Sequence, residues 1–126
     1  MPLIKIELKK GLDKQTLLSL KDTVMEAIIC ILQLPDDDKN IRLIEHEPDF
    51  FQLGSPYEIL VEITLFSGRT KETKKELYKT IAENLTSIGI EKEKVFIVLN
   101  EQPAINWGLR GGIPADEINL NFKVDI

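Results

Sequence analysis

The stretch that decides the fold is residues 2–16, "PLIKIELKKGLDKQT", because its pattern returns in residues 59–73, "ILVEITLFSGRTKET". In each copy apolar and polar side chains alternate, which is typical of a β-strand, and a glycine then precedes a helical segment. A shift of 57 residues aligns the copies at Ile4/Val61, Ile6/Ile63, Leu8/Leu65, Gly11/Gly68, Asp13/Thr70, Lys14/Lys71 and Thr16/Thr73. The chain therefore contains an internal duplication.

Each copy continues into a helix and a second strand. After Asp13, a good helix N-cap, apolar residues recur at helical spacing, and residues 41–47, "IRLIEHE", predict a strand. In the second copy Thr70 opens a helix that ends near Gly89, and residues 94–100, "KVFIVLN", predict a strand. These second strands align at a shift of 54 residues, as if the second helix were about one turn shorter.

Two tandem βαβ units predict an α/β (α+β) fold. Because each crossover is right-handed, both helices should cover one face of a shared four-stranded mixed sheet. We expect one domain over residues 1–126, with repeats at 2–47 and 58–101 and a C-terminal loop and strand at 102–126. The tail "EINLNFKV", residues 117–124, alternates apolar and polar side chains and predicts that last strand.

The sheet face without helices needs a cover. Leu43, Leu60, Ile97 or their neighbours should place more apolar side chains there than a solvated surface carries. A partner subunit is the simplest cover, and the alternating tail either docks on its own sheet or reaches a neighbour.

Composition excludes several classes of partner. The net charge of −5 gives no general attraction to nucleic-acid phosphates. The single cysteine, Cys30, stands in an apolar helical segment that predicts a buried side chain, and the absence of an internal disulfide suits a reducing cytoplasm. The start resembles no signal peptide, and no apolar run approaches the roughly 18 residues of a spanning helix. We expect a soluble cytoplasmic protein that binds neither nucleic acid nor a membrane.

A duplicated βαβ chain that begins Met-Pro and carries "GRTKETKKELYKTI", residues 68–81, resembles the tautomerase superfamily. That superfamily includes 4-oxalocrotonate tautomerase, macrophage migration inhibitory factor and malonate semialdehyde decarboxylase. The resemblance is closest to the decarboxylase branch and runs to about Ile113. It rests on Pro2-Leu3, the "PDDD" that contains Asp38, the "GR" that contains Arg69, and the "NWGLRGG" that contains Trp107. It implies a homotrimer with the sheets facing inward, a small carboxylate substrate and no cofactor.

The resemblance also implies roles for single residues. Pro2 matches the catalytic amine once Met1 is removed, and Arg69 matches an arginine that binds or polarises a substrate carboxylate. Asp38 matches the acid that positions water or the amine. Trp107 and Leu109 match the aromatic wall of the pocket.

Two residues depart from the family pattern, and the first of them bears on decarboxylation. Ser67 stands where the decarboxylase carries a second arginine, so the two-arginine clamp on the carboxylate is incomplete. Leu109 replaces a phenylalanine in the loop. The neighbouring Arg110 is a candidate replacement for the missing arginine.

The residues themselves leave alternatives open. Pro2 suits the first position of a strand, but as a free N-terminus it would be a secondary amine, which burial keeps neutral. Arg69 opposes the dipole at a helix N-terminus, so stability alone does not favour it there. Asp38 belongs to an acidic run typical of a solvated helix exit. His46 is the only histidine and lacks ligands at metal spacing, so we expect no metal site.

We therefore expect keto–enol tautomerisation of a small 2-oxo acid, with Pro2 as the general base and Arg69 on the carboxylate. One alternative is a cofactor-independent decarboxylase or hydratase of small three-carbon acids. The other is a trimeric binding protein without catalytic activity.

Overall fold

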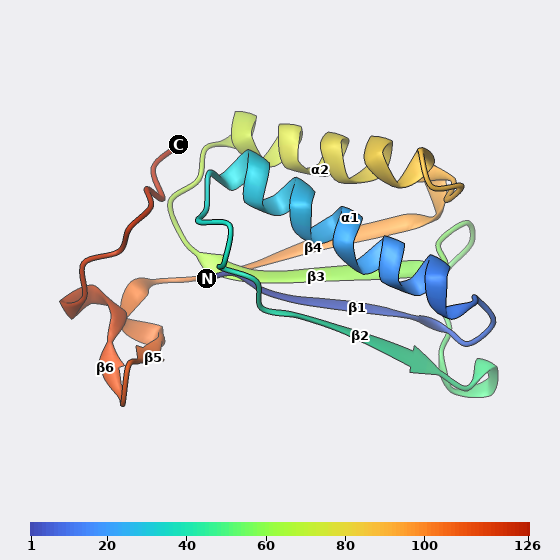
Figure 1. Ribbon diagram of the computed structural model, residues 1–126, viewed down its shortest axis with the longest axis horizontal. Coiled ribbons are helices and arrows are strands. Elements are labelled where there is room, and N and C mark those ends of the chain that lie inside the picture. Colours follow the sequence, from blue (N-terminus) through green and yellow to red (C-terminus); the bar gives the residue numbers. More distant parts are fainter.

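Two strand–helix–strand units follow each other along residues 1–126 of the computed structural model (Figure 1). Their elements are β1 Leu3–Lys9, α1 Lys14–Leu32, β2 Ile41–His46, β3 Ile59–Phe66, α2 Lys71–Thr86 and β4 Val95–Gln102. The shorter elements are η1 Pro48–Phe50, η2 Lys92–Lys94, η3 Ala104–Asn106, β5 Gly108–Leu109, β6 Ile113–Pro114 and η4 Ala115–Glu117. The predicted tandem units are confirmed, with strand ends that differ by one or two residues. Neither long helix is apolar enough over its length to cross a membrane.

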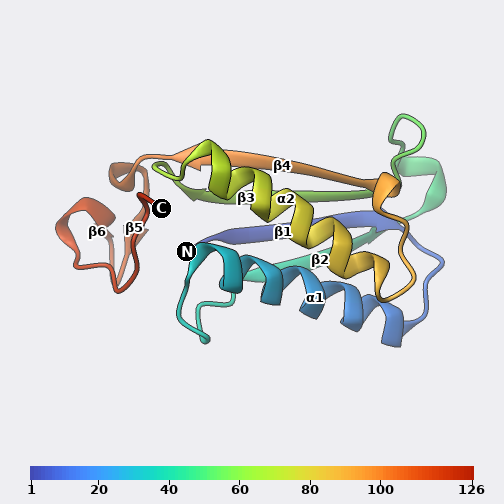
Figure 2. The same cartoon turned by 90° about the horizontal axis from the view of Figure 1, so that it is seen from above.

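The sheet has the strand order β2-β1-β3-β4. β1 pairs with β2 and β3 pairs with β4 in parallel, whereas β1 and β3 are antiparallel, with Ile6 opposite Val61. Both helices lie side by side on one face of this sheet (Figure 2). The predicted mixed sheet with helices on one face is confirmed.

The core forms between that face and the helices. Ile4, Ile6 and Leu8 alternate along β1 with polar side chains, and all three are buried against the helices. The helices contribute Leu20, Val24, Ile28 and Leu32 from α1 and Leu77, Ile81 and Leu85 from α2. Full burial of each such side chain contributes roughly 1.5–3 kcal/mol. This packing fixes the start of β1 beside the end of β3.

Both helices begin after the predicted residues. The Thr70 hydroxyl oxygen accepts a hydrogen bond from the Thr73 N–H at 3.2 Å, so Thr70 caps α2. Asp13 precedes α1, but its carboxylate accepts from the Thr16 hydroxyl and caps no backbone N–H.

Cys30 is exposed, so the prediction of a buried thiol is wrong. Cys30 follows the inward-facing Ile28 by two residues, and on a helix that step turns a side chain away from the core stripe.

The helix-free face is only partly the one that we predicted. Leu43 and Ile97 pair with the inward-facing Ile6 and Val61 and pack against the helical core, so their assignment to the free face is wrong. Leu60 does lie on the free face. Its partners across the sheet are Phe96 on β4 and Glu7 on β1, so apolar and charged side chains share this surface.

His46 has structural contacts on the same face. Its Nε2 lies 3.1 Å from Glu7 Oε1, and its ring stacks on Phe51 at a centroid distance of 4.8 Å.

The predicted C-terminal strand does not form. Residues 118–126 contain no strand and pack irregularly beyond the end of the sheet (Figure 1). Phe122 contacts both apolar clusters of the chain, and the Ile126 carbonyl oxygen accepts from the Thr70 N–H at 3.0 Å. The tail therefore covers the β3–α2 corner of its own chain, where its last carbonyl oxygen bonds Thr70 and Thr73 at the start of α2 rather than a strand.

Candidate active site

Three segments meet beside the start of β1, and they are the α1–β2 loop, the segment after β4 and the tail, residues 118–126. Because β2 runs parallel to β1, the α1–β2 loop returns to the end of the sheet where β1 begins. Because β3 and β4 run antiparallel to β1, the segment after β4 leaves at the same end. A cavity of about 310 Å³ lies among these segments, and its lining includes Met1, Asp37, Asp38, Leu109, Arg110 and Phe122.

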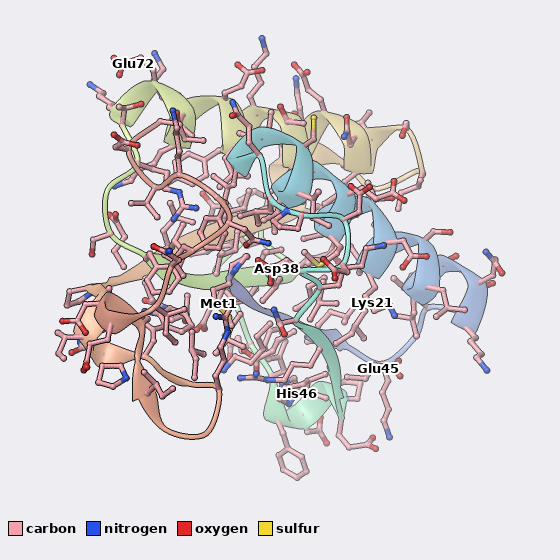
Figure 3. The ribbon with its side chains drawn as sticks, turned by 60° about the vertical axis from the view of Figure 1, so that its left-hand side comes forward. Met1, Lys21, Asp38, Glu45, His46 and Glu72 are labelled. Atoms are coloured by element: carbon pink, nitrogen blue, oxygen red, sulfur yellow. The ribbon has the colours of Figure 1, made fainter.

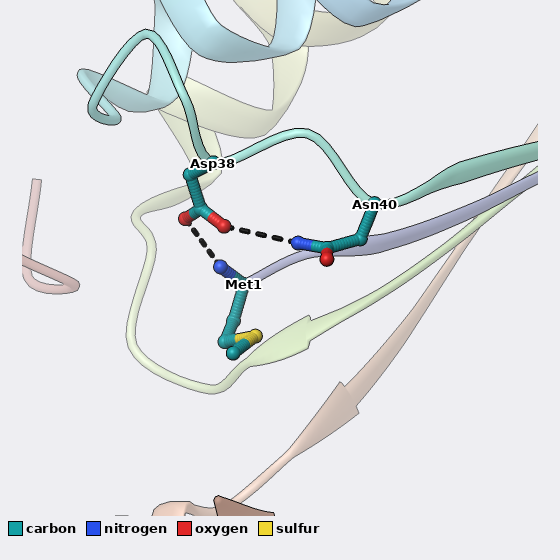
Figure 4. A network of polar contacts seen from close by, with 3 residues as sticks. All are labelled: Met1, Asp38 and Asn40. Carbon is teal, nitrogen blue, oxygen red and sulfur yellow. Dashed lines mark hydrogen bonds and ion pairs between the residues drawn. The ribbon is translucent and has the colours of Figure 1, made fainter. Parts of the chain in front are cut away.

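Asp38 binds the amino terminus of the chain. The Met1 ammonium donates to Asp38 Oδ2, and Asn40 Nδ2 donates to Asp38 Oδ1 at 3.0 Å (Figure 4). Met1 and Asp38 lie together at this end of the molecule (Figure 3). The half-buried carboxylate is thus held between an amine and an amide, which differs from a solvated helix exit. Asn40 was not among the predicted site residues. Its only signal in the sequence is that it is polar and stands two residues after Asp38.

Pro2 is buried directly after Met1. While Met1 is attached, the Pro2 nitrogen is an amide that neither donates nor accepts a proton. Removal of Met1 would leave a secondary amine about one residue, or ~3.8 Å along the chain, from the present amino terminus. The catalytic role of Pro2 stays a prediction that depends on that removal.

Arg69 is buried, with 6% of its surface exposed. Its Nη1 donates to the Phe66 carbonyl oxygen at 3.0 Å, whereas Nε and Nη2 have no hydrogen-bond partner. Burial lowers the pKa of the guanidinium below its ordinary value, and the negative charge of Glu101 partly offsets this shift. Arg69 therefore carries a desolvated charge that lacks a bound counter-ion.

The tail is the reason that Arg69 is buried. Its guanidinium carbon lies 5.9 Å from the centroid of the Phe122 ring, and Phe122 also lines the cavity. At Gly68 a Cβ atom would come within 3.0 Å of the Val124 carbonyl oxygen, so the close approach of the tail requires glycine there. Arg69 itself does not line the cavity. The Phe122 ring lines the cavity and also lies against the Arg69 guanidinium. Nothing in the sequence pointed to Phe122 as a site residue.

The other predicted residues divide between the cavity and its surroundings. Leu109 and Arg110 line it, whereas Trp107 is buried and does not line it, and its ring lies 4.7 Å from the Phe66 ring. Ser67 is exposed and does not line the cavity. The structure thus brings Asp38, Leu109 and Arg110 to one cavity with the amino terminus.

A larger cavity of about 410 Å³ lies at the opposite end of the sheet, and it is the repeat counterpart of the first. The 57-residue shift maps Pro2 onto Ile59 and Arg69 onto Leu12, and both counterparts line the larger cavity. Ile59 lies within the chain and offers no amine, and Leu12 offers no guanidinium. The two repeats therefore place a cavity at each end of the sheet, and an amino terminus lines only the smaller one.

The smaller cavity can hold a small anion beside an amine. Asp38 binds the amino terminus, Arg110 lines the cavity, and the Arg69 guanidinium lies against the Phe122 ring. Such a set suits proton transfer on a carboxylate-bearing substrate, because a cation stabilises the negative charge that develops on removing a proton.

Comparison with known proteins adds sequence relatives. Residues 38–110 match a family model described as "Tautomerase enzyme". The chain is 32% identical over 121 residues to the probable tautomerase YusQ of Bacillus subtilis (strain 168), an alignment that covers 89% of this chain and 95% of that protein.

Solved structures share the fold. The crystal structure of FG41 malonate semialdehyde decarboxylase inhibited by 3-bromopropiolate matches with a TM-score of 0.82 and 25% identity over 94% of this chain and 98% of that one. A wild-type fused 4-OT described as a symmetric trimer matches with a TM-score of 0.80 and 20% identity, over 90% of this chain and 96% of that one.

Proposed function

Because the chain belongs to the tautomerase superfamily, we propose that it catalyses keto–enol tautomerisation of a small 2-oxo acid at the cavity beside its amino terminus. The observation that carries the proposal is the position of the amino terminus. It lies on Asp38, in a cavity that Arg110 and Phe122 line, and the Phe122 ring also contacts the partly unpaired guanidinium of Arg69.

In the proposed reaction Pro2 carries the proton after Met1 is removed. The neutral Pro2 amine takes the proton from the enol oxygen, so the O–H bond breaks and an enolate forms. The resulting ammonium returns the proton to the neighbouring carbon, where a C–H bond forms as the carbonyl is restored. Arg69 binds the carboxylate and stabilises the enolate, with Arg110 as a second cation at the rim.

A decarboxylase or hydratase is the second candidate, and the Asp38 contact favours it. Asp38 places a carboxylate beside the amino terminus, and such a pair suits a reaction in which a protonated amine serves as an acid. In decarboxylation of a 3-oxo acid the bond to the carboxylate carbon breaks, carbon dioxide leaves, and the electron pair moves to the oxo oxygen beside that ammonium. The structural similarity to a malonate semialdehyde decarboxylase also supports this candidate.

The pH dependence of Asp38→Asn separates the two reactions. For a base, kcat/KM of the Met1-free chain rises with pH as the amine loses its proton. Asp38→Asn removes the charge that stabilises the ammonium, so the midpoint of that rise should move down by about half a pH unit or more. For an acid, kcat/KM instead falls with pH, and Asp38→Asn lowers the rate at neutral pH.

Asp37→Asn is the matched control. Asp37 lines the same cavity but does not bind the amino terminus, so its amide should leave the midpoint within about 0.2 pH units. Equal shifts in the two variants would contradict the role of Asp38, because they would reflect only the net charge of the loop.

We also propose that the chain is a homotrimer whose sheets face inward. The partly apolar free face supports this, as do the fused 4-OT trimers of the same fold. Sedimentation should give about three times the chain mass of 14.4 kDa, and Leu60→Glu on the free face should reduce it to one chain. Leu18→Glu places the same charge on the exposed side of α1 and should leave the trimer intact. A wild-type mass of one chain at micromolar concentration would end the proposal.

A further inference from the structure

Three buried side-chain nitrogen atoms lack a hydrogen-bond partner, and they belong to two residues. They are Nε and Nη2 of Arg69 and Nε1 of Trp107. Arg69 is 6% exposed and Trp107 is 8% exposed, so water has little access to these donors. Buried donors in folded proteins are almost always paired, so these donors indicate an acceptor that arrives with a ligand.

The unpaired atoms of Arg69 form one edge of the guanidinium. Nη1 is held by the Phe66 carbonyl oxygen at 3.0 Å, which leaves the Nε–H and an Nη2–H pointing side by side. That edge fits the two oxygens of a carboxylate. Glu101 is the carboxylate whose charge acts on Arg69, but it binds Lys74 Nζ at 2.5 Å and makes no ion pair with Arg69.

Trp107 and Arg69 are joined through Phe66. The Trp107 ring lies 4.7 Å from the Phe66 ring, and the carbonyl of Phe66 holds Arg69. The Phe122 ring lies 6.0 Å from Phe66 and 5.9 Å from the Arg69 guanidinium carbon. Trp107 therefore belongs to an apolar cluster at the end of β3 against which Met1 packs, and Arg69 borders that cluster through the Phe66 carbonyl and the Phe122 ring.

We propose that Trp107 donates a hydrogen bond through Nε1 to the carboxylate that the free edge of Arg69 binds. This proposed hydrogen bond rests on the proposed function. It gives Trp107 a role in selecting substrates that carry a carboxylate, in addition to the apolar contacts of its ring. A carboxylate offers about four acceptor positions, so two bonds from Arg69 leave room for the indole N–H.

Part of the tail must move before a carboxylate can contact Arg69 and Trp107. Phe122 lies over Arg69 and lines the cavity, so a carboxylate reaches the donors when the Phe122 ring moves aside. Residues 118–126 form no helix or strand, and such segments open at low free-energy cost.

Trp107→Phe tests the proposal because it keeps an aromatic ring and removes the N–H. Ketonisation is measured for the enol of phenylpyruvate and for its methyl ester, which has no carboxylate charge. We expect kcat/KM for the acid to fall at least about tenfold, mainly through KM, and kcat/KM for the ester to change by less than about twofold. Leu109→Ala is the matched control, because Leu109 lines the cavity without a donor and should affect acid and ester equally.

An equal fall in kcat/KM for the acid and the ester in Trp107→Phe would overturn the proposal, because Trp107 would then act only through the apolar contacts of its ring. If the wild-type chain ketonises neither compound, the proposed function fails, and calorimetric binding of phenylpyruvate decides the role of Trp107 by itself. Weaker binding in the variant supports the donor, and equal affinity overturns it. If Trp107→Phe does not fold, benzothienylalanine at position 107 keeps the two-ring shape and replaces the N–H with sulfur.

Discussion

Replacing Arg69 with alanine should lower kcat/KM for a 2-oxo acid enol by roughly 100-fold or more, with a higher KM and a lower kcat. The physical reason is the state of the guanidinium, which is desolvated, unpaired along one edge, and adjacent to the cavity that holds the amino terminus. A charge in such surroundings interacts with an enolate far more strongly than a solvated one. Steady-state kinetics on the Met1-free chain measures both constants.

Arg69→Lys is the control for charge alone. An ammonium keeps the charge but cannot present the planar fork, so the lysine variant should recover little of the lost activity. Thermal unfolding of both variants separates this effect from loss of the contact between Arg69 and the Phe66 carbonyl. If Arg69→Ala left both constants within about twofold, less than roughly 0.5 kcal/mol, Arg69 would be abandoned and Arg110 tested next.

The Pro2 nitrogen should have the largest effect of all. In a chain that retains Met1 this nitrogen is an amide, which cannot accept the enol proton, so activity should be almost absent. In a chain that begins at Pro2 it is a buried secondary amine, for which burial favours the neutral form. Pro2→Ala keeps an amine, but a primary and more mobile one, so a partial loss of kcat is expected after Met1 is removed.

The duplication made the arrangement of the main sheet predictable from sequence. The alternation in residues 2–8 and its return in residues 59–65 specify the two central strands, and the helical spacing between the strands specifies the crossovers. The alternation does not specify which face of each outer strand packs on the helices, because apolar side chains occur on both faces of β2 and β4. A one-residue difference in register moves Leu43 and Ile97 from the free face to the core.

The site was predictable where it depends on strand direction. Asp38 follows α1 and precedes a strand parallel to β1, so it had to return to the start of β1. The burial of Arg69 was not predictable, because it depends on the tail. Residues 118–124 alternate like a strand, and only the packing of Phe122 and Val124 against the β3–α2 corner shows that they cover Arg69 instead.

One measurement tests the central claim, that the free nitrogen of Pro2 performs the chemistry. A single preparation is assayed for ketonisation of the phenylpyruvate enol before and after an aminopeptidase trims Met1, and mass spectrometry gives the fraction of chains that begin at Pro2. If the free nitrogen of Pro2 performs the chemistry, the rate rises in proportion to that fraction and is close to zero when Met1 is retained. Equal rates for trimmed and untrimmed chains would contradict it and would leave Pro2 as the first residue of a strand.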